Sequence, residues 1–159
     1  MIIKKICLAI LLFAPAYLYC QVTPRSTTML EWDLEKTGKA VSVENATCNI
    51  ENVFSTVCWV KISANRSADH FILTKGVKEN DPGYLQLRIS KSGELQFSAF
   101  SLSGNMKSGI RINDNNWHQL AVSYVPGRMK FYKDGILITT TEVNGIIQDK
   151  PSLLTIGAD

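Results

Sequence analysis

Apolar and polar residues alternate with a period of two along most of the chain after residue 20. The segment 28–35, TMLEWDLE, places apolar residues at every second position between acidic ones, and the segments 84–90 and 120–124 follow the same pattern. Such alternation is typical of a β-strand with one buried and one exposed face. No stretch of useful length repeats apolar residues at the helical period. The pattern therefore predicts an all-β protein.

Turn-forming residues divide this pattern into short segments. Pro126-Gly127 is a strong turn signal, and Asp134-Gly135 fits a two-residue type I′ hairpin turn in which glycine supplies a positive φ. The other predicted strands cover residues 39–44, 54–62, 70–74, 94–100, 129–133, 136–142 and 152–156. Short strands separated by a turn signal about every 8–12 residues predict an antiparallel β-sandwich or jelly roll.

The first twenty residues differ from the rest. Two lysines precede an apolar run over residues 6–13, which is too short to cross a bilayer comfortably. This arrangement predicts a secretory signal peptide over residues 1–20, with cleavage after Ala16 or after Cys20. No later segment is a candidate membrane span. We therefore expect the mature domain, residues 21–159, to be secreted, extracellular or at a cell surface.

Removal of that signal would leave two cysteines, Cys48 and Cys58. In an oxidising compartment they could form a disulfide bond, or they could stay reduced with Cys58 packed as a small apolar residue. Two cysteines do not define a disulfide framework, so both alternatives stay open. Asn45 and Asn65 each begin an N-x-S/T triplet, which is a glycosylation acceptor if the secretory pathway is eukaryotic.

The charge balance argues against a nucleic-acid partner. The chain has 17 Lys and Arg against 14 Asp and Glu, a net charge of +3, and two of the positive charges belong to the predicted signal. The remaining excess of positive charge is too small for the basic surface patch that nucleic-acid binding requires. The sequence therefore predicts a partner outside this class.

Five segments of the chain, taken in order, form a distinctive pattern. They are FSTVCWVK at 54–61, ILTKG at 72–76, NWHQLAVSY at 116–124, MKFYKDG at 129–135 and LLTIG at 153–157. Together they resemble laminin G-like jelly-roll domains of the concanavalin A-like lectin/glucanase superfamily, over roughly residues 28–159. The resemblance implies that Trp117 starts a strand and packs in or beside the core. The matched residues are framework residues, so they imply a fold and not a ligand.

One departure from this family concerns the end of the chain. Relatives usually continue past the Thr-Ile-Gly position with a loop and at least one further apolar strand. The sequence stops at Asp159, so the resemblance implies a domain that lacks its closing strand or strands. We therefore expect this chain to be the N-terminal part of a longer multidomain protein, with downstream domains among its partners.

Candidate binding residues are few. His118 is one of two histidines, and neither has a metal-ligand spacing, so we assign no metal and expect His118 to face solvent. Asp81 and Tyr84 are candidates for an acidic ligand and a stacking ring in a turn-rich segment. Many relatives bind calcium through loop oxygens, so calcium stays open as a cofactor, without an assigned ligand set.

The sharpest enzymatic alternative rests on Glu31, Asp33 and Glu35, which match the Glu-x-Asp-x-Glu spacing of glucanases. On an unbulged strand the Cα atoms of the two glutamates lie about 13 Å apart. Retaining glycosidases hold their carboxyl groups about 5–5.5 Å apart. A solvated acidic face is the better interpretation, so we assign no catalytic residues. A glycoside hydrolase, or an accessory domain of one, stays as the alternative.

These observations favour a recognition module over an enzyme. The sequence predicts a secreted, non-catalytic domain that binds carbohydrate or a glycosylated or extracellular-matrix protein. This prediction depends on the expected extracellular location and on the family resemblance. It does not depend on a binding pocket.

Overall fold

A computed structural model of the chain describes residues 6–9, 30–32, 40–46, 53–62, 68–77, 81–104, 106–148 and 150–158. Within these ranges the regular structure consists of β-strands. No helix that could cross a membrane occurs in the described part of the chain.

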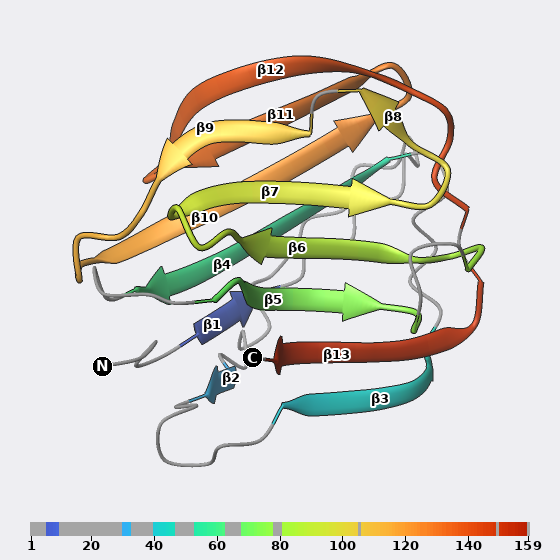
Figure 1. Cartoon of the computed structure of the whole chain (residues 1–159), viewed down its shortest axis with the longest axis horizontal. Coiled ribbons are helices and arrows are strands. Elements are labelled where there is room, and N and C mark those ends of the chain that lie inside the picture. The colour runs from blue at the N-terminus through green and yellow to red at the C-terminus, as the bar shows by residue number, and fades with distance from the viewer. Residues whose placement is uncertain are drawn as a thin grey trace, which may run out of the picture.

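The strands form two antiparallel sheets that pack face to face (Figure 1). The seven-stranded sheet has the order β2 (Leu30–Trp32), β1 (Ile6–Ala9), β4 (Phe54–Lys61), β10 (Trp117–Val125), β11 (Arg128–Lys133), β12 (Ile136–Asn144) and β8 (Ser103–Gly104). The six-stranded sheet has the order β3 (Val41–Ala46), β13 (Ser152–Ala158), β5 (His70–Lys75), β6 (Leu85–Ile89), β7 (Glu94–Ala99) and β9 (Lys107–Arg111). This architecture confirms the predicted antiparallel β-sandwich.

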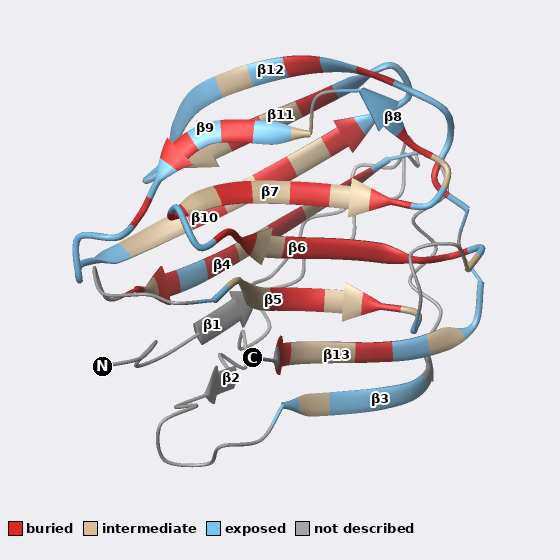
Figure 2. Cartoon of the chain, in the orientation of Figure 1, coloured by how far each residue is buried: buried red, intermediate tan, exposed pale blue. Residues whose placement is uncertain are grey.

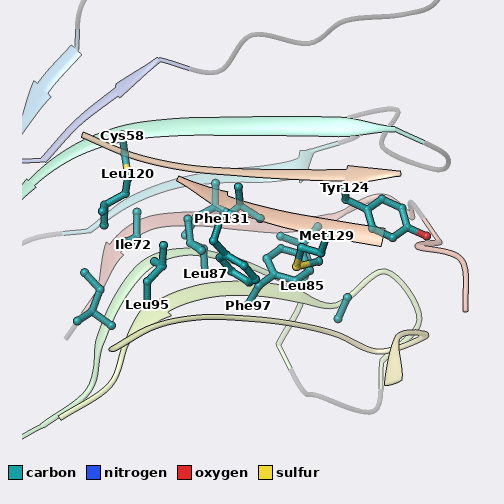
Figure 3. Close-up of a cluster of buried hydrophobic side chains, with 14 of the residues drawn as sticks. Cys58, Ile72, Leu85, Leu87, Leu95, Phe97, Leu120, Tyr124, Met129 and Phe131 are labelled. Atoms are coloured by element: carbon teal, nitrogen blue, oxygen red, sulfur yellow. The ribbon is translucent and has the colours of Figure 1, made fainter. Parts of the chain in front are cut away.

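The core lies between the two sheets and follows the predicted alternation. Along β10, Leu120, Val122 and Tyr124 are at most 1% exposed, and they face the buried residues of β6 and β7 (Figure 3). Phe54 joins the two layers, because its ring lies 5.5 Å from that of Phe97 in the opposite sheet. Burial of each such large side chain contributes about 1.5–3 kcal/mol. Figure 2 shows buried and more exposed positions alternating along these strands.

The two predicted hairpin turns are present. Strands β10 and β11 are joined through Pro126 and Gly127, whose φ is 85°. Asp134 and Gly135 join β11 to β12 with φ values of 52° and 78°. Two consecutive positive φ values are the requirement of a type I′ turn, which confirms the prediction at this position.

The structure adds two strands that the residue pattern did not indicate. Strands β8 and β9 lie between the predicted strands at 94–100 and 120–124. In β9, Ser108 and Ile110 are the buried positions, and Ser108 is 0% exposed. A strand that contains lysine, serine and glycine has low β propensity, so its pairing with β7 depends on tertiary packing.

Strand β1 lies within the predicted signal peptide and pairs with β2 and β4. Cleavage on export is a processing event, so the signal peptide over residues 1–20 stays a prediction. The Cys58 side chain is 0% exposed in the core. Cys48 lies outside the described residues, so the disulfide also stays a prediction.

Candidate functional site

The two-residue alternation that builds the core also builds a solvent-facing surface on β4, β10 and β11. Core residues of β4 and β10 occupy even-numbered positions, so odd-numbered positions point away from the core. The register continues this surface onto β11. We call it the outer face, and it consists of Ser55, Val57, Trp59, Lys61, Trp117, Gln119, Ala121, Ser123, Val125, Arg128, Lys130 and Tyr132.

Two tryptophans lie close together on the outer face. Trp59 is 40% exposed and Trp117 is 39% exposed. Trp59 pairs with Gln119, and Trp117 pairs with Lys61. The two indoles are therefore diagonal cross-strand neighbours, a relation that typically separates residues by about 7–8 Å.

Trp117 starts strand β10, as the resemblance implied, but its side chain is 39% exposed on the outer face and does not pack within the core. The residues themselves carried the necessary information. Leu120 and Trp117 are three positions apart on one strand, so they point to opposite faces.

Beside the tryptophans, β11 supplies an aromatic ring and two cations. Tyr132, Lys130 and Arg128 occupy successive outward positions of this strand, opposite Ala121, Ser123 and Val125 of β10. The three β11 residues, with Ser123 and Val125, line a hollow of about 120 Å³. Enclosed small-molecule sites are larger, about 300–1,000 Å³. A ligand would therefore lie across this surface instead of being enclosed by it.

His118 lies next to Trp117 but does not face solvent as expected. Its side chain is 12% exposed and is held between two carboxylates. Nδ1 lies 2.8 Å from Asp134 Oδ2, and Nε2 lies 3.0 Å from Asp114 Oδ2. Carboxylates accept hydrogen bonds, so a ring nitrogen that carries a proton can donate to the carboxylate beside it. We call these three side chains the histidine bracket.

The histidine bracket also binds the backbone around it. The Gln119 N–H donates to Asp134 Oδ1 over 2.9 Å, and the Asn116 N–H donates to Asp114 Oδ1 over 3.0 Å. These contacts join the loop before β10, the start of β10 and the β11–β12 turn. The bracket therefore holds the backbone on both sides of Trp117, and both nitrogens of its imidazole are already bonded.

The same contacts lower the pKa values of both acids. The Asn116 N–H, followed by the His118 ring, lowers the pKa of Asp114 from 3.8 to about 2, against an opposing effect of burial. Burial acts to raise the pKa of Asp134. The hydrogen bonds from His118 and the Gln119 N–H, together with nearby positive charge, outweigh it, so that pKa is lowered. Both carboxylates are therefore ionised near neutral pH.

Metal binding has no support in the described ranges, where no group of three or more His, Cys, Asp or Glu side chains is arranged to hold an ion. This finding leaves calcium as an untested expectation for the whole chain.

The residues singled out from the sequence are placed elsewhere or lie outside the description. Tyr84 is 5% exposed, so its ring is part of the packed interior, and its N–H donates to the Asp81 carbonyl over 3.0 Å. Glu31 lies on β2 and Asn45 on β3, but their side chains are outside the described structure. Four further candidates lie outside the described residues, namely Asp33, Glu35, Cys48 and Asn65.

The fold and this surface define a two-sheet, jelly-roll type of β-sandwich. Residues 35–159 match the family described as "Concanavalin A-like lectin/glucanases superfamily", of the laminin G type. The chain therefore belongs to the laminin G-like domains of this superfamily, as its sequence resemblance implied. A search of curated protein sequences finds no match.

Solved structures agree on the fold. The laminin α1 chain of mouse, domains LG4-5, is similar with a TM-score of 0.56 and 12% identity, over 72% of this chain and 31% of that chain. The chain thus spans about a third of that laminin fragment. Two more distant matches are a Ruminococcus gnavus IT-sialidase CBM40 bound to α2,3-sialyllactose (TM-score 0.41, 12% identity, 73% and 90% covered) and a Bacillus licheniformis β-glucanase (TM-score 0.43, 12% identity, 77% and 81% covered).

Proposed function

We propose that this protein is an exported carbohydrate-recognition module whose glycan lies across the outer face. The observation that carries the proposal is the pair of exposed indoles, Trp59 and Trp117, on neighbouring strands of one sheet face. A large aromatic ring that stays in contact with water on a rigid sheet is typical of an interaction surface.

The chemistry of the surface suits a sugar. One face of a pyranose ring presents C–H groups that pack against an indole, while its hydroxyls point outward and need hydrogen-bond partners. Gln119 lies beside Trp59 in the register and offers both donors and an acceptor. Ser55 and Ser123 are paired across β4 and β10 and add hydroxyls. Apolar platforms and polar groups therefore alternate over the same face.

The fold supports precise placement of these groups. Trp59 and Gln119 belong to β4 and β10, whose opposite sides are anchored in the core. The histidine bracket holds the backbone at the start of β10. A platform on strands that are fixed in this way loses little conformational freedom on binding.

Export is part of the proposal and rests on the signal-like pattern of residues 1–20. N-terminal sequencing of protein recovered from the medium of expressing cells tests it. We expect the mature chain to begin at Tyr17 or Gln21. Retention of the intact N-terminus inside the cell would contradict export without affecting the binding site.

Binding of the full chain to a panel of immobilised oligosaccharides tests the recognition role. We compare the wild type with Trp59→Ala and with Gln96→Ala, a control on the outside of the other sheet. Truncation of a central aromatic contact commonly costs about 2 kcal/mol, or about 30-fold in affinity. We expect that loss for Trp59→Ala and wild-type binding for Gln96→Ala, with equal melting temperatures. A folded protein that binds no glycan, or binds equally well without Trp59, would contradict the proposal.

A further inference from the structure

Two neighbouring cations of the outer face, both on β11, lack ionic partners in the described structure. Arg128 is exposed and Lys130 is half-buried, and neither forms a salt bridge with a described residue. Both line the hollow together with Tyr132. The hollow therefore combines an aromatic ring with two positive charges that no described acid neutralises through direct contact.

The strand geometry arranges these groups in a row. Successive outward positions of a β-strand lie about 6.6–6.8 Å apart. The phenol of Tyr132, the ammonium of Lys130 and the guanidinium of Arg128 therefore start from backbone positions that span about 13 Å along β11. An oligosaccharide that lies along β11 would place one ring on Tyr132 and present a substituent of a neighbouring unit to the cations.

The residues that flank the two cations are mainly neutral. Lys130 pairs with Ser123 on one side and Thr140 on the other, so two hydroxyls accompany its ammonium group. Arg128 pairs with Val125 and with Glu142, which is the one acid among these four cross-strand partners. Arg128, Lys130 and their four cross-strand partners together carry a positive net charge, even when Glu142 is included. Hydroxyl and guanidinium donors in such a setting suit the oxygens of a carboxylate or sulfate.

We infer that the glycan bound by the outer face is anionic, with a carboxylate or sulfate group held by Lys130 and Arg128 while sugar rings stack on Tyr132 and the tryptophans. This inference rests on the proposed carbohydrate-binding function. It assigns charge recognition to the two β11 cations and ring stacking to Tyr132 and the tryptophans. Glu142 opposes the anion and limits its affinity.

Two matched pairs of probes test the charge requirement on the full chain by isothermal titration. Oligogalacturonate is compared with its methyl ester, and a sulfated dextran oligosaccharide with unsulfated dextran of the same length. We expect at least one acidic probe to bind at least tenfold more tightly than its neutral partner. The pair that shows the difference distinguishes a carboxylate from a sulfate. Equal affinity within both pairs would overturn the inference.

Charge variants locate the effect. Lys130→Gln combined with Arg128→Gln should remove the preference for the acidic probe, which is measured as the ratio of the affinities for the acidic probe and its neutral partner. Glu142→Gln should strengthen binding of the acidic probe several-fold. Raising the salt concentration should weaken binding of the acidic probe alone, because salt screens exposed charges. An unchanged preference in the Lys130/Arg128 variant would overturn the assignment of these residues, provided that its melting temperature matches the wild type.

The Trp59→Ala variant separates the two proposals. If neutral and acidic probes bind equally and Trp59→Ala abolishes both, the carbohydrate-binding function stands and the anionic preference fails. If neither these probes nor any member of the oligosaccharide panel binds to the folded protein, both proposals fail. If the acidic probe binds with the expected preference and loses affinity in both the tryptophan and the charge variants, both are supported.

Discussion

The two sheets present their outward surfaces to solvent in different ways. On the six-stranded sheet the surface we call the back face consists of Thr74, Arg88, Gln96, Ser98 and Thr155, around Gln86, which is only 7% exposed. There the Arg88 guanidinium donates to Gln96 over 3.2 Å and forms an ion pair with Asp69 at 3.2 Å. Gln96 in turn donates to Glu94 over 3.2 Å. The charged and amide groups at this end of the back face thus bind one another.

The outer face lacks a comparable network. Trp59 and Trp117 remain partly exposed, and Arg128 and Lys130 form no ion pair with a described residue. Both surfaces arise because side chains alternate between the two sides of each strand, so the fold alone does not explain why the two surfaces differ. A surface that keeps its interaction capacity unused is a better candidate for binding than one whose side chains already bind each other.

The largest expected effect is the loss of binding when both outer-face indoles are removed. The double variant Trp59→Ala, Trp117→Ala should weaken glycan binding at least 100-fold, because two central contacts of about 2 kcal/mol each would be lost. Melting temperature should change little, because both side chains are already partly exposed. Titration with the best probe, alongside Gln96→Ala, measures the contrast. Equal losses in the two variants would abolish the distinction between the faces.

A smaller effect is expected when the histidine bracket is broken. His118→Gln removes an imidazole that contacts a carboxylate on both sides, and a glutamine amide cannot reach both acids in the same geometry. We expect a loss of about 1 kcal/mol in the free energy of unfolding, a typical net contribution of one intramolecular hydrogen bond. In a domain of this size that corresponds to a fall of about 2–4 °C in melting temperature.

The same variant tests whether the bracket positions Trp117. If it does, His118→Gln should also weaken glycan binding several-fold at temperatures well below its melting point. A lower melting temperature with unchanged affinity would make the bracket a purely structural feature. Calorimetry and titration on one preparation supply both values.

Stability should depend on acid through the bracket. Folding lowers the pKa of Asp114 from 3.8 to about 2, so the folded state favours the ionised form. The resulting stabilisation is fully present above pH 3.8, and it is lost as the pH falls from 3.8 toward about 2. Asp134, whose pKa is also lowered, acts in the same direction. Urea unfolding across this range should show a steeper decline for the wild type than for Asp114→Asn, and parallel curves would contradict the prediction.

The smallest effect is expected on the back face. Arg88→Gln removes a partly exposed ion pair, which typically contributes about 0.2–1 kcal/mol to stability. Glycan affinity should stay within twofold of the wild type, because the residue lies on the opposite sheet. A large loss of affinity in this variant would move the binding site away from the outer face.

The sequence by itself determined most of the strands, which of their side chains face the core, and the tight turn. Burial at even positions of β4 and β10 follows from side chains that alternate across a strand. The Asp134-Gly135 turn follows from the few residues that tolerate positive φ. Both properties act over neighbouring residues, so a linear pattern contains them. The exposure of Trp59 and Trp117 could have been predicted in the same way.

Only the tertiary structure decided which strands lie side by side, and that choice built the candidate site. Trp59 and Trp117 are distant in sequence and become neighbours because β4 pairs with β10. His118 meets Asp134 because β11 returns alongside β10 and ends in the turn that carries the aspartate. Strand order and register are set by how the two apolar faces pack together. That packing depends on the whole core at once, and so no local pattern could reveal the proximity of these side chains.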